Sequence, residues 1–84
     1  MKVEKALADI LRRERRKKKL SQEKIAILAD VDRSYYSKIE RGENKPTLNI
    51  LFKISAVLEM KLSEIIKDLE SCLPKTKKKS QKQV

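Results

Sequence analysis

The sequence has little of what turns, disulfides and membrane spans require. Its 84 residues include one glycine, two prolines and a single cysteine, Cys72. The scarcity of glycine and proline argues against β-hairpins, and the abundance of Leu, Ile, Ala, Lys and Glu favours helices. One cysteine excludes an internal disulfide and fits a reducing compartment such as the cytoplasm. No run approaches the ~20 apolar residues of a membrane span, and no signal peptide is expected.

The residue types that carry acid–base and metal chemistry are also scarce. Histidine is absent, and the sequence shows no Gly-rich phosphate loop, no paired metal ligands and no activating setting for Cys72. General acid–base and metal catalysis therefore lack their usual groups. The sequence predicts that the protein is not an enzyme and binds neither a metal nor a cofactor.

Positive charge, in contrast, is in excess. Lys and Arg number 22 against 12 Asp and Glu, giving a net charge of +10. A small basic protein attracts polyanions, nucleic acid first and acidic membrane or protein surfaces second. RNA is the weaker candidate because only Tyr35, Tyr36 and Phe52 are present to stack on unpaired bases.

Apolar residues recur with the helical period in five segments. The first begins near Val3 and is expected to continue into the basic run RRERRKKK at 12–19. Four more helices are expected after polar residues that suit an N-cap, namely Ser21, Asp32, Thr47 and Ser63. Pro74 marks the end of the folded domain, which we expect over residues 1–73.

Residues 74–84 are expected to form a disordered basic tail, because KTKKKSQKQV holds five lysines and no acid. Two interpretations of this tail remain open. It either binds flanking phosphates in a salt-sensitive way or is a solvated terminus without a fixed role.

The most informative segment is Gln22–Arg41, QEKIAILADVDRSYYSKIER, where two short helices are joined at Asp30-Val31-Asp32. Ala26 is small enough to sit where the helices cross. Apolar residues spaced to lock the pair are Ile25, Ala29, Val31, Tyr36 and Ile39. The later helix of the pair, over 33–41, keeps a basic, hydrogen-bonding face that can enter a major groove. The same pattern also fits an ordinary helical hairpin with a solvated face.

The stretch LSQEKIAILADVDRSYYSKIERGENKPTL resembles the helix-turn-helix domains of the Cro and lambda-repressor-like (Xre-type) family. Ser-Gln-Glu, Ile-Glu-Arg-Gly and Pro-Thr-Leu carry the resemblance, which runs from about Leu7 to Ile66. It implies an all-α, five-helix lambda-repressor-like domain with its third helix in the major groove. The part DRSYYSKIERG is also similar to the controller proteins of restriction–modification systems.

The resemblance implies roles for particular residues. Those implied to contact bases are Arg33, Ser34, Tyr35, Ser37 and Lys38. Those implied to contact phosphates are Ser21, Gln22, Arg41, Asn44 and Lys45. Arg15 and Glu40 match a pair that forms a structural salt bridge beneath the third helix. Plainer interpretations remain open: Tyr35 as a shield for the helix pair, Ser21 as a cap alone, and a solvated loop at 43–46.

Three positions depart from the family pattern. Glu14 stands where a core aliphatic residue is common, and Asp30 replaces the usual glycine of the central turn. Lys19 replaces the usual Gly or Asn before the second helix. A lysine there is expected either to strain the turn or to avoid the left-handed conformation.

Self-association is the next expectation, because Cro-like operators are read by two-fold dimers. Apolar residues are in surplus late in the chain, from Phe52 to Leu69. We expect a homodimer interface on the fifth helix and the end of the fourth, formed by Val57, Met60, Leu62, Ile65, Ile66 and Leu69. The alternative is that these residues complete the core of the monomer.

The leading hypothesis is a cytoplasmic bacterial or phage transcription regulator that binds a palindromic operator in double-stranded DNA. It would repress by occluding a promoter or activate by touching RNA polymerase, for which Glu23 and Glu43 are the candidate acidic contacts. The competing hypothesis is an antitoxin-type module that binds DNA but has a toxin as its main partner. The lysine tail is a poor match for a toxin-binding segment.

Overall fold

The computed structural model describes residues 3–73, so the tail expected at 74–84 lies outside the described residues. The helices are α1 (Val3–Lys17), α2 (Gln22–Ala29), α3 (Arg33–Glu40), α4 (Leu48–Leu58) and α5 (Leu62–Cys72). No strand occurs between residues 3 and 73. The prediction of an all-α, five-helix fold is therefore confirmed.

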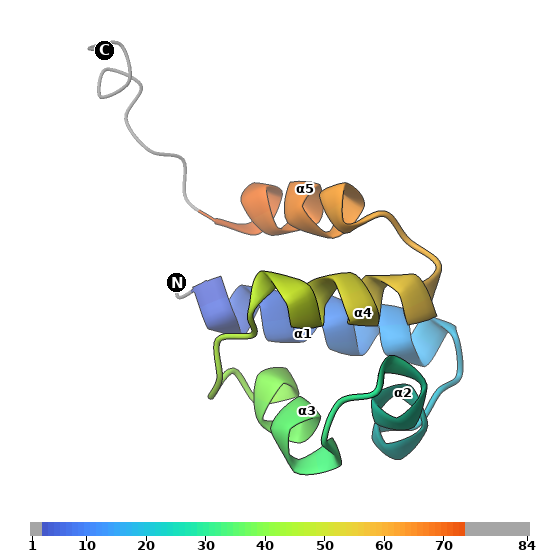
Figure 1. Cartoon of the computed structure of the whole chain (residues 1–84). Helices are drawn as coiled ribbons and strands as arrows, with labels where there is room; N and C mark the ends of the chain where they lie inside the picture. The colour runs from blue at the N-terminus through green and yellow to red at the C-terminus, as the bar shows by residue number, and fades with distance from the viewer. Residues whose placement is uncertain (1–2, 74–84) are drawn as a thin grey trace, which may run out of the picture.

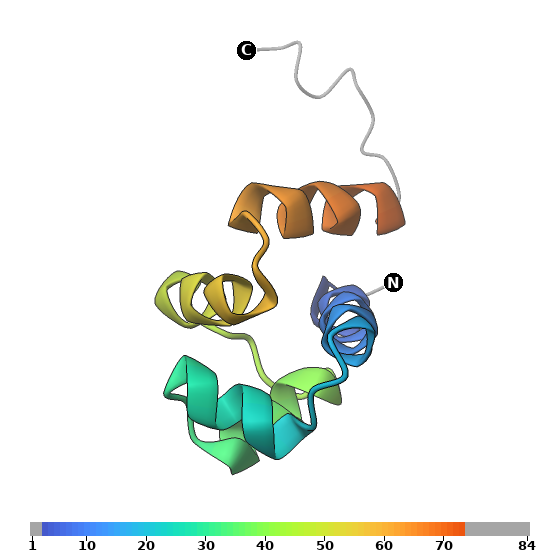
Figure 2. The same ribbon diagram turned by 90° about the vertical axis from the view of Figure 1, so that its right-hand side faces the viewer.

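The helices occupy three levels, as the two views show (Figure 1; Figure 2). α1 and α4 form the middle level, α2 and α3 lie below it, and α5 lies above it. α1 packs against α3 and α5, while α2 packs against α3 and α4. The α2–α3 pair and α5 are therefore on opposite sides of the molecule.

The core draws on every helix. Its fully buried side chains include Leu11, Ile25, Tyr36, Ile54 and Ile65, one from each helix in turn. Three apolar residues of the helices are nevertheless about half exposed or more, namely Val3, Leu28 and Leu48. Val3 and Leu48 are the first residues of α1 and α4, and the apolar period cannot show where a neighbouring helix stops covering a face.

Three of the four predicted helix caps are confirmed. Backbone N–H groups donate to the side chains of Ser21, Asp32 and Thr47. The cap predicted for the fifth helix is wrong, because Lys61 rather than Ser63 is the N-cap of α5. The Lys61 N–H donates to the Glu64 carboxylate over 3.0 Å, which fixes the helix start one turn ahead of that acid.

Four turn residues have the left-handed backbone conformation. Gly42 has φ +74°, and a Cβ placed on it would lie 3.4 Å from the Lys5 Cα. Lys19, Asp30 and Glu59 have φ of 59°, 58° and 59°. Lys19 therefore adopts the left-handed conformation that its glycine-like position requires, and it does not avoid it.

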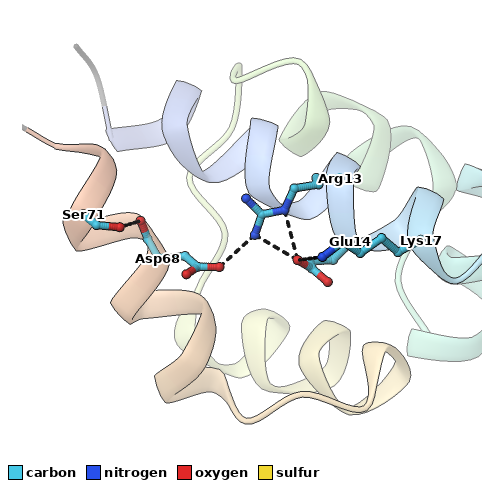
Figure 3. Close-up of polar contacts among 5 residues, drawn as sticks. All are labelled: Arg13, Glu14, Lys17, Asp68 and Ser71. Atoms are coloured by element: carbon cyan, nitrogen blue, oxygen red, sulfur yellow. Dashed lines mark hydrogen bonds and ion pairs between the residues drawn. The ribbon is translucent and has the colours of Figure 1, made fainter.

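Ion pairs attach the basic end of α1 to α5 (Figure 3). Arg13 bridges to Asp68 of α5 over 2.7 Å and to Glu14 over 2.8 Å, and Glu14 also pairs with Lys17 over 3.4 Å. Glu14, which stands at a position expected to be aliphatic, is thus satisfied by two cations with its side chain 14% exposed. Lys18 pairs with Glu59 in the turn between α4 and α5.

The conformation of Lys19 leads to a stability prediction. A left-handed residue other than glycine is strained by ~1–2 kcal/mol, and the flexibility of glycine in the unfolded chain offsets part of any gain. We expect Lys19→Gly to raise the free energy of unfolding by ~0.5–1 kcal/mol, measured by urea denaturation.

Arg16→Gly is the matched control, since Arg16 is also exposed but lies within α1. A helical glycine lowers stability by ~0.5–1 kcal/mol, so the two variants should shift in opposite directions. A loss of stability in Lys19→Gly would contradict the assignment of a left-handed turn there.

Candidate nucleic-acid interface

α2 and α3 form a compact helix–turn–helix. Ala26 is 1% exposed at the crossing of the helices, and its carbonyl accepts the Val31 N–H from the turn over 2.9 Å. Asp30 supplies the left-handed residue that reverses the chain, and Asp32 then caps α3. This local chemistry places α3 with Tyr36 and Ile39 inward and its polar residues outward.

The outward side of α3 has a shallow notch of about 160 Å³. Its lining consists only of cations and hydroxyl-bearing residues, namely Arg33, Ser34, Ser37, Lys38 and Arg41. Arg33 is exposed, and its guanidinium donates to no side chain or carbonyl between residues 3 and 73. Four of the five residues predicted to contact bases thus lie together at one surface.

Tyr35, the fifth predicted base contact, does not line the notch. Its ring is partly buried and packs against the hydrophobic core. The structure thereby supports the interpretation of Tyr35 as a shield for the helix pair, although part of the side chain remains accessible.

Arg41 was predicted to bind phosphate, but its exposed side chain is hydrogen-bonded to two neighbouring surface residues. Its Nε and Nη2 donate to the two Glu43 carboxylate oxygens over 3.0 and 3.2 Å. Its Nη1 donates to the Ser37 hydroxyl over 3.0 Å. The hydrogen bonds from Arg41 lower the pKa of the Glu43 carboxyl, with a smaller electrostatic effect of Lys38.

The other predicted phosphate contacts are dispersed. Ser21 caps α2, leaving the first backbone N–H groups of that helix without helical partners. The Gln22 side chain turns inward and donates to Glu40 over 2.9 Å. Lys45 lies in the α3–α4 loop, 82% exposed at its side chain and 3.4 Å from the Glu4 carboxylate of α1.

A buried polar cluster centred on Glu40 lies beneath this surface. Arg15 donates to both Glu40 oxygens, over 2.7 Å from Nε and 3.0 Å from Nη2, and to the Leu20 carbonyl over 2.8 Å. The salt bridge implied by the family resemblance is therefore present. The Tyr36 hydroxyl and the Gln22 amide also donate to Glu40, contacts that sequence reasoning missed.

The environment of Glu40 shifts its pKa in two directions. Burial raises the pKa of the carboxyl, but the hydrogen bonds from Arg15, Tyr36 and Gln22 together outweigh burial and lower it. Burial and the neighbouring Glu40 charge raise the pKa of the Tyr36 hydroxyl, which stays protonated and donating. All buried side-chain nitrogens and oxygens between residues 3 and 73 have partners.

The residues predicted for a dimer interface divide into two groups. Leu62, Ile65 and Leu69 are buried in the monomer's own core, because α5 packs on α1 with this face. The partly accessible members are Val57, Met60 and Ile66. An open groove between α4 and α5 adds Phe52, which is 57% exposed and which the predicted interface left out.

Other kinds of site find no support in residues 3–73. That range has no group of three His, Cys, Asp or Glu side chains arranged to hold a metal ion. None of its helices combines the length and apolar character that crossing a bilayer demands.

Comparison with known proteins gives consistent matches. A model of the helix-turn-helix family matches residues 11–65. The chain is 51% identical to the control protein C.MunI of a Mycoplasma species over 51 residues, 61% of this chain and 69% of that protein. It is 42% identical over 57 residues to the HTH-type transcriptional regulator SlrR of Bacillus subtilis, covering 67% of this chain and 38% of that protein.

Among solved structures, the restriction-modification controller protein C.AhdI from Aeromonas hydrophila superposes with a TM-score of 0.72 at 34% identity. That match covers 74% of this chain and 94% of the controller protein. The similarity therefore extends over nearly the whole of C.AhdI, beyond the α2–α3 segment alone.

The Glu40 cluster generates a pH-dependent stability prediction. Glu40→Gln leaves Arg15 buried without a counter-charge, so it should lower the free energy of unfolding by ~3–5 kcal/mol at pH 7. Because the pKa of Glu40 is lowered by folding, its stabilisation is present above the usual carboxyl pKa and is lost as the pH falls through the lowered value. The difference from wild type should therefore shrink in acid.

Urea denaturation at pH 7 and at acidic pH measures both effects. Glu43→Gln is the control, since Glu43 also pairs with an arginine but is exposed, and its unfolding free energy should hardly change. If the difference in unfolding free energy between wild type and Glu40→Gln stayed constant into acid, the ionised carboxylate would not be what stabilises the fold.

Proposed function

The chain belongs to the helix-turn-helix family of DNA-binding transcription regulators, and we propose that it binds a palindromic operator as a homodimer with α3 in the major groove. The observation that carries this proposal is the notch on α3, where cations and hydroxyls gather on one exposed side of a short helix. Its relatives are regulators and control proteins, and not enzymes, as expected from the sequence.

Sequence readout would begin with Arg33. Its guanidinium is exposed at the first turn of α3, and the planar fork of an arginine matches the O6 and N7 acceptors of guanine. Ser34 and Lys38 extend the same surface with a hydroxyl and an ammonium group. Tyr35 would offer the accessible part of its ring to a thymine methyl or to the DNA backbone.

Phosphate contacts would flank this surface. The N-terminus of α2 offers the unpaired backbone N–H groups of Gln22 and Glu23, favoured by the helix dipole, while Ser21 maintains the cap. Asn44 and Lys45 in the α3–α4 loop would supply further contacts with the phosphates of the DNA backbone. Lys45 would have to exchange its long contact with Glu4 for a phosphate oxygen.

A homodimer is supported by the groove between α4 and α5. Its apolar lining consists of Phe52, Ala56, Met60 and Ile66, which are at least partly exposed in the monomer, and of the largely buried Leu62. Lys67 and Glu70 at its edge carry opposite charges, which a two-fold copy could pair across the axis. Because α5 lies on the level opposite α3, association here leaves α3 accessible (Figure 2).

The relatives favour a regulatory role over the antitoxin alternative. C.MunI is a control protein, and C.AhdI a restriction-modification controller protein, so we propose control of restriction–modification genes in a bacterial cytoplasm. A contact with RNA polymerase would fall to Glu23, because Glu43 is held by Arg41.

Substitution at Arg33 tests the readout. Arg33→Ala should remove a base contact worth roughly 1–3 kcal/mol and so reduce the preference for an operator over scrambled duplex by about tenfold or more. The operator is first selected by wild-type protein from a random duplex pool, and affinities are then measured at fixed salt.

Lys45→Ala is the comparison, since a phosphate contact carries no sequence information. It should weaken binding to operator and scrambled duplexes alike and lower the slope of log affinity against log salt by about one. Equal losses of preference in both variants would count against assigning Arg33 to the bases.

Dimer formation is tested at Phe52. Phe52→Glu places a charge in the groove but little in the core, because Phe52 is 57% exposed, so the protein should fold as a monomer. Ile27→Glu is the matched control, since Ile27 is 66% exposed on α2 and lies outside the groove. Sedimentation should show dimers for wild type and for Ile27→Glu, and monomers for Phe52→Glu. A Phe52→Glu dimer would place the interface elsewhere.

A further inference from the structure

The hydrogen bonding of Ser37 in the α3 notch differs from that of two other helical serines. Ser55 and Ser71 each donate their hydroxyl to the carbonyl three residues earlier, over 3.0 and 2.9 Å. The Ser37 hydroxyl makes no such bond within residues 3–73, and accepts instead from Arg41 Nη1 over 3.0 Å. Its hydrogen is therefore the part of the hydroxyl left to bind something outside the protein.

Arg41 sets this polarity because a guanidinium can only donate. Its charge beside the Ser37 oxygen repels the approach of a second N–H donor and strengthens the O–H as a donor. The carboxylate of Glu43 occupies Nε and Nη2, so the arginine cannot turn to a phosphate without breaking both hydrogen bonds. Ser37, Arg41 and Glu43 thus form a chain of hydrogen bonds, and the hydroxyl hydrogen of Ser37 is left available in the notch.

We propose that Ser37 reads a hydrogen-bond acceptor on a base edge and that Arg41, held by Glu43, is the residue that positions it. This rests on the proposed placement of α3 in the major groove. The acceptors offered there are N7 and O6 of guanine, N7 of adenine and O4 of thymine. The amino groups of cytosine and adenine are donors and are disfavoured. Arg41 is accordingly a positioning residue for specificity, and not the phosphate ligand that the family resemblance implies.

The test compares base preferences after selection from a random duplex pool. Ser37→Ala should lose preference at one base pair of each half-site by roughly tenfold, the effect of one lost base contact. Arg41→Ala should lose it at the same base pair, and the double variant should lose no more than either single one. Arg41→Lys keeps the charge but lacks the fork that reaches both Ser37 and Glu43, so it should resemble Arg41→Ala.

A modified duplex identifies the acceptor. If the selected base is a purine, replacing its N7 by carbon should weaken wild type by roughly tenfold and leave Ser37→Ala unchanged. If O6 or O4 is the acceptor, the corresponding analogue lacking that oxygen should give the same contrast. Because all three side chains lie at the surface of α3 and its loop, thermal unfolding of each variant should match wild type.

Four outcomes would overturn the inference. Arg41→Ala could weaken every duplex equally and lower the salt slope by about one, which would make Arg41 a phosphate ligand. Ser37→Ala and Arg41→Ala could change different base pairs, or Ser37→Ala none, while wild type still selects an operator. If wild type itself selects no sequence, the proposed function fails, and the inference fails with it.

Discussion

The geometry of the α2–α3 pair depends on Glu40, the one buried carboxylate in residues 3–73. It is the last residue of α3, is 4% exposed, and accepts hydrogen bonds from α1 through Arg15 and from α2 through Gln22. Apolar packing alone would let two short helices rotate about their contact. A carboxylate with fixed donors from two other helices gives the pair one orientation, and the outward side of α3 follows from it.

Charge is distributed in a way that the composition does not reveal. The basic run at the end of α1 is largely compensated by acids that lie close in space, among them Asp68 and Glu59, which are distant in sequence. The notch on α3 has no acid in its lining. The net charge predicts an affinity for polyanions, and the pairing pattern shows that Arg33 and Lys38 of the notch form no ion pair within residues 3–73, whereas Arg41 pairs with Glu43.

The sequence predicted the helices, three of their four N-caps and the gathering of Arg33, Ser34, Ser37 and Lys38 on one surface, because these depend on local period and capping chemistry. It could not predict that Arg41 turns back to Glu43, since a polar residue in a loop has no period. Leu62, Ile65 and Leu69 were ambiguous for a related reason: an apolar stripe does not say whether it faces a neighbouring helix or a second chain. The capping of α5 was missed because Lys61 caps through its backbone, with Glu64 as acceptor.

The three-level arrangement has a consequence for how such proteins diverge. α5 and the α2–α3 pair are separated by α1 and α4 (Figure 1), so the two outer levels share little packing. Substitutions on one outer level therefore seldom alter the packing of the other. Under the proposed function, duplicate genes that encode this architecture can change the partner surface on α5 while keeping the base-contacting residues of α3, or change those residues while keeping the partner surface.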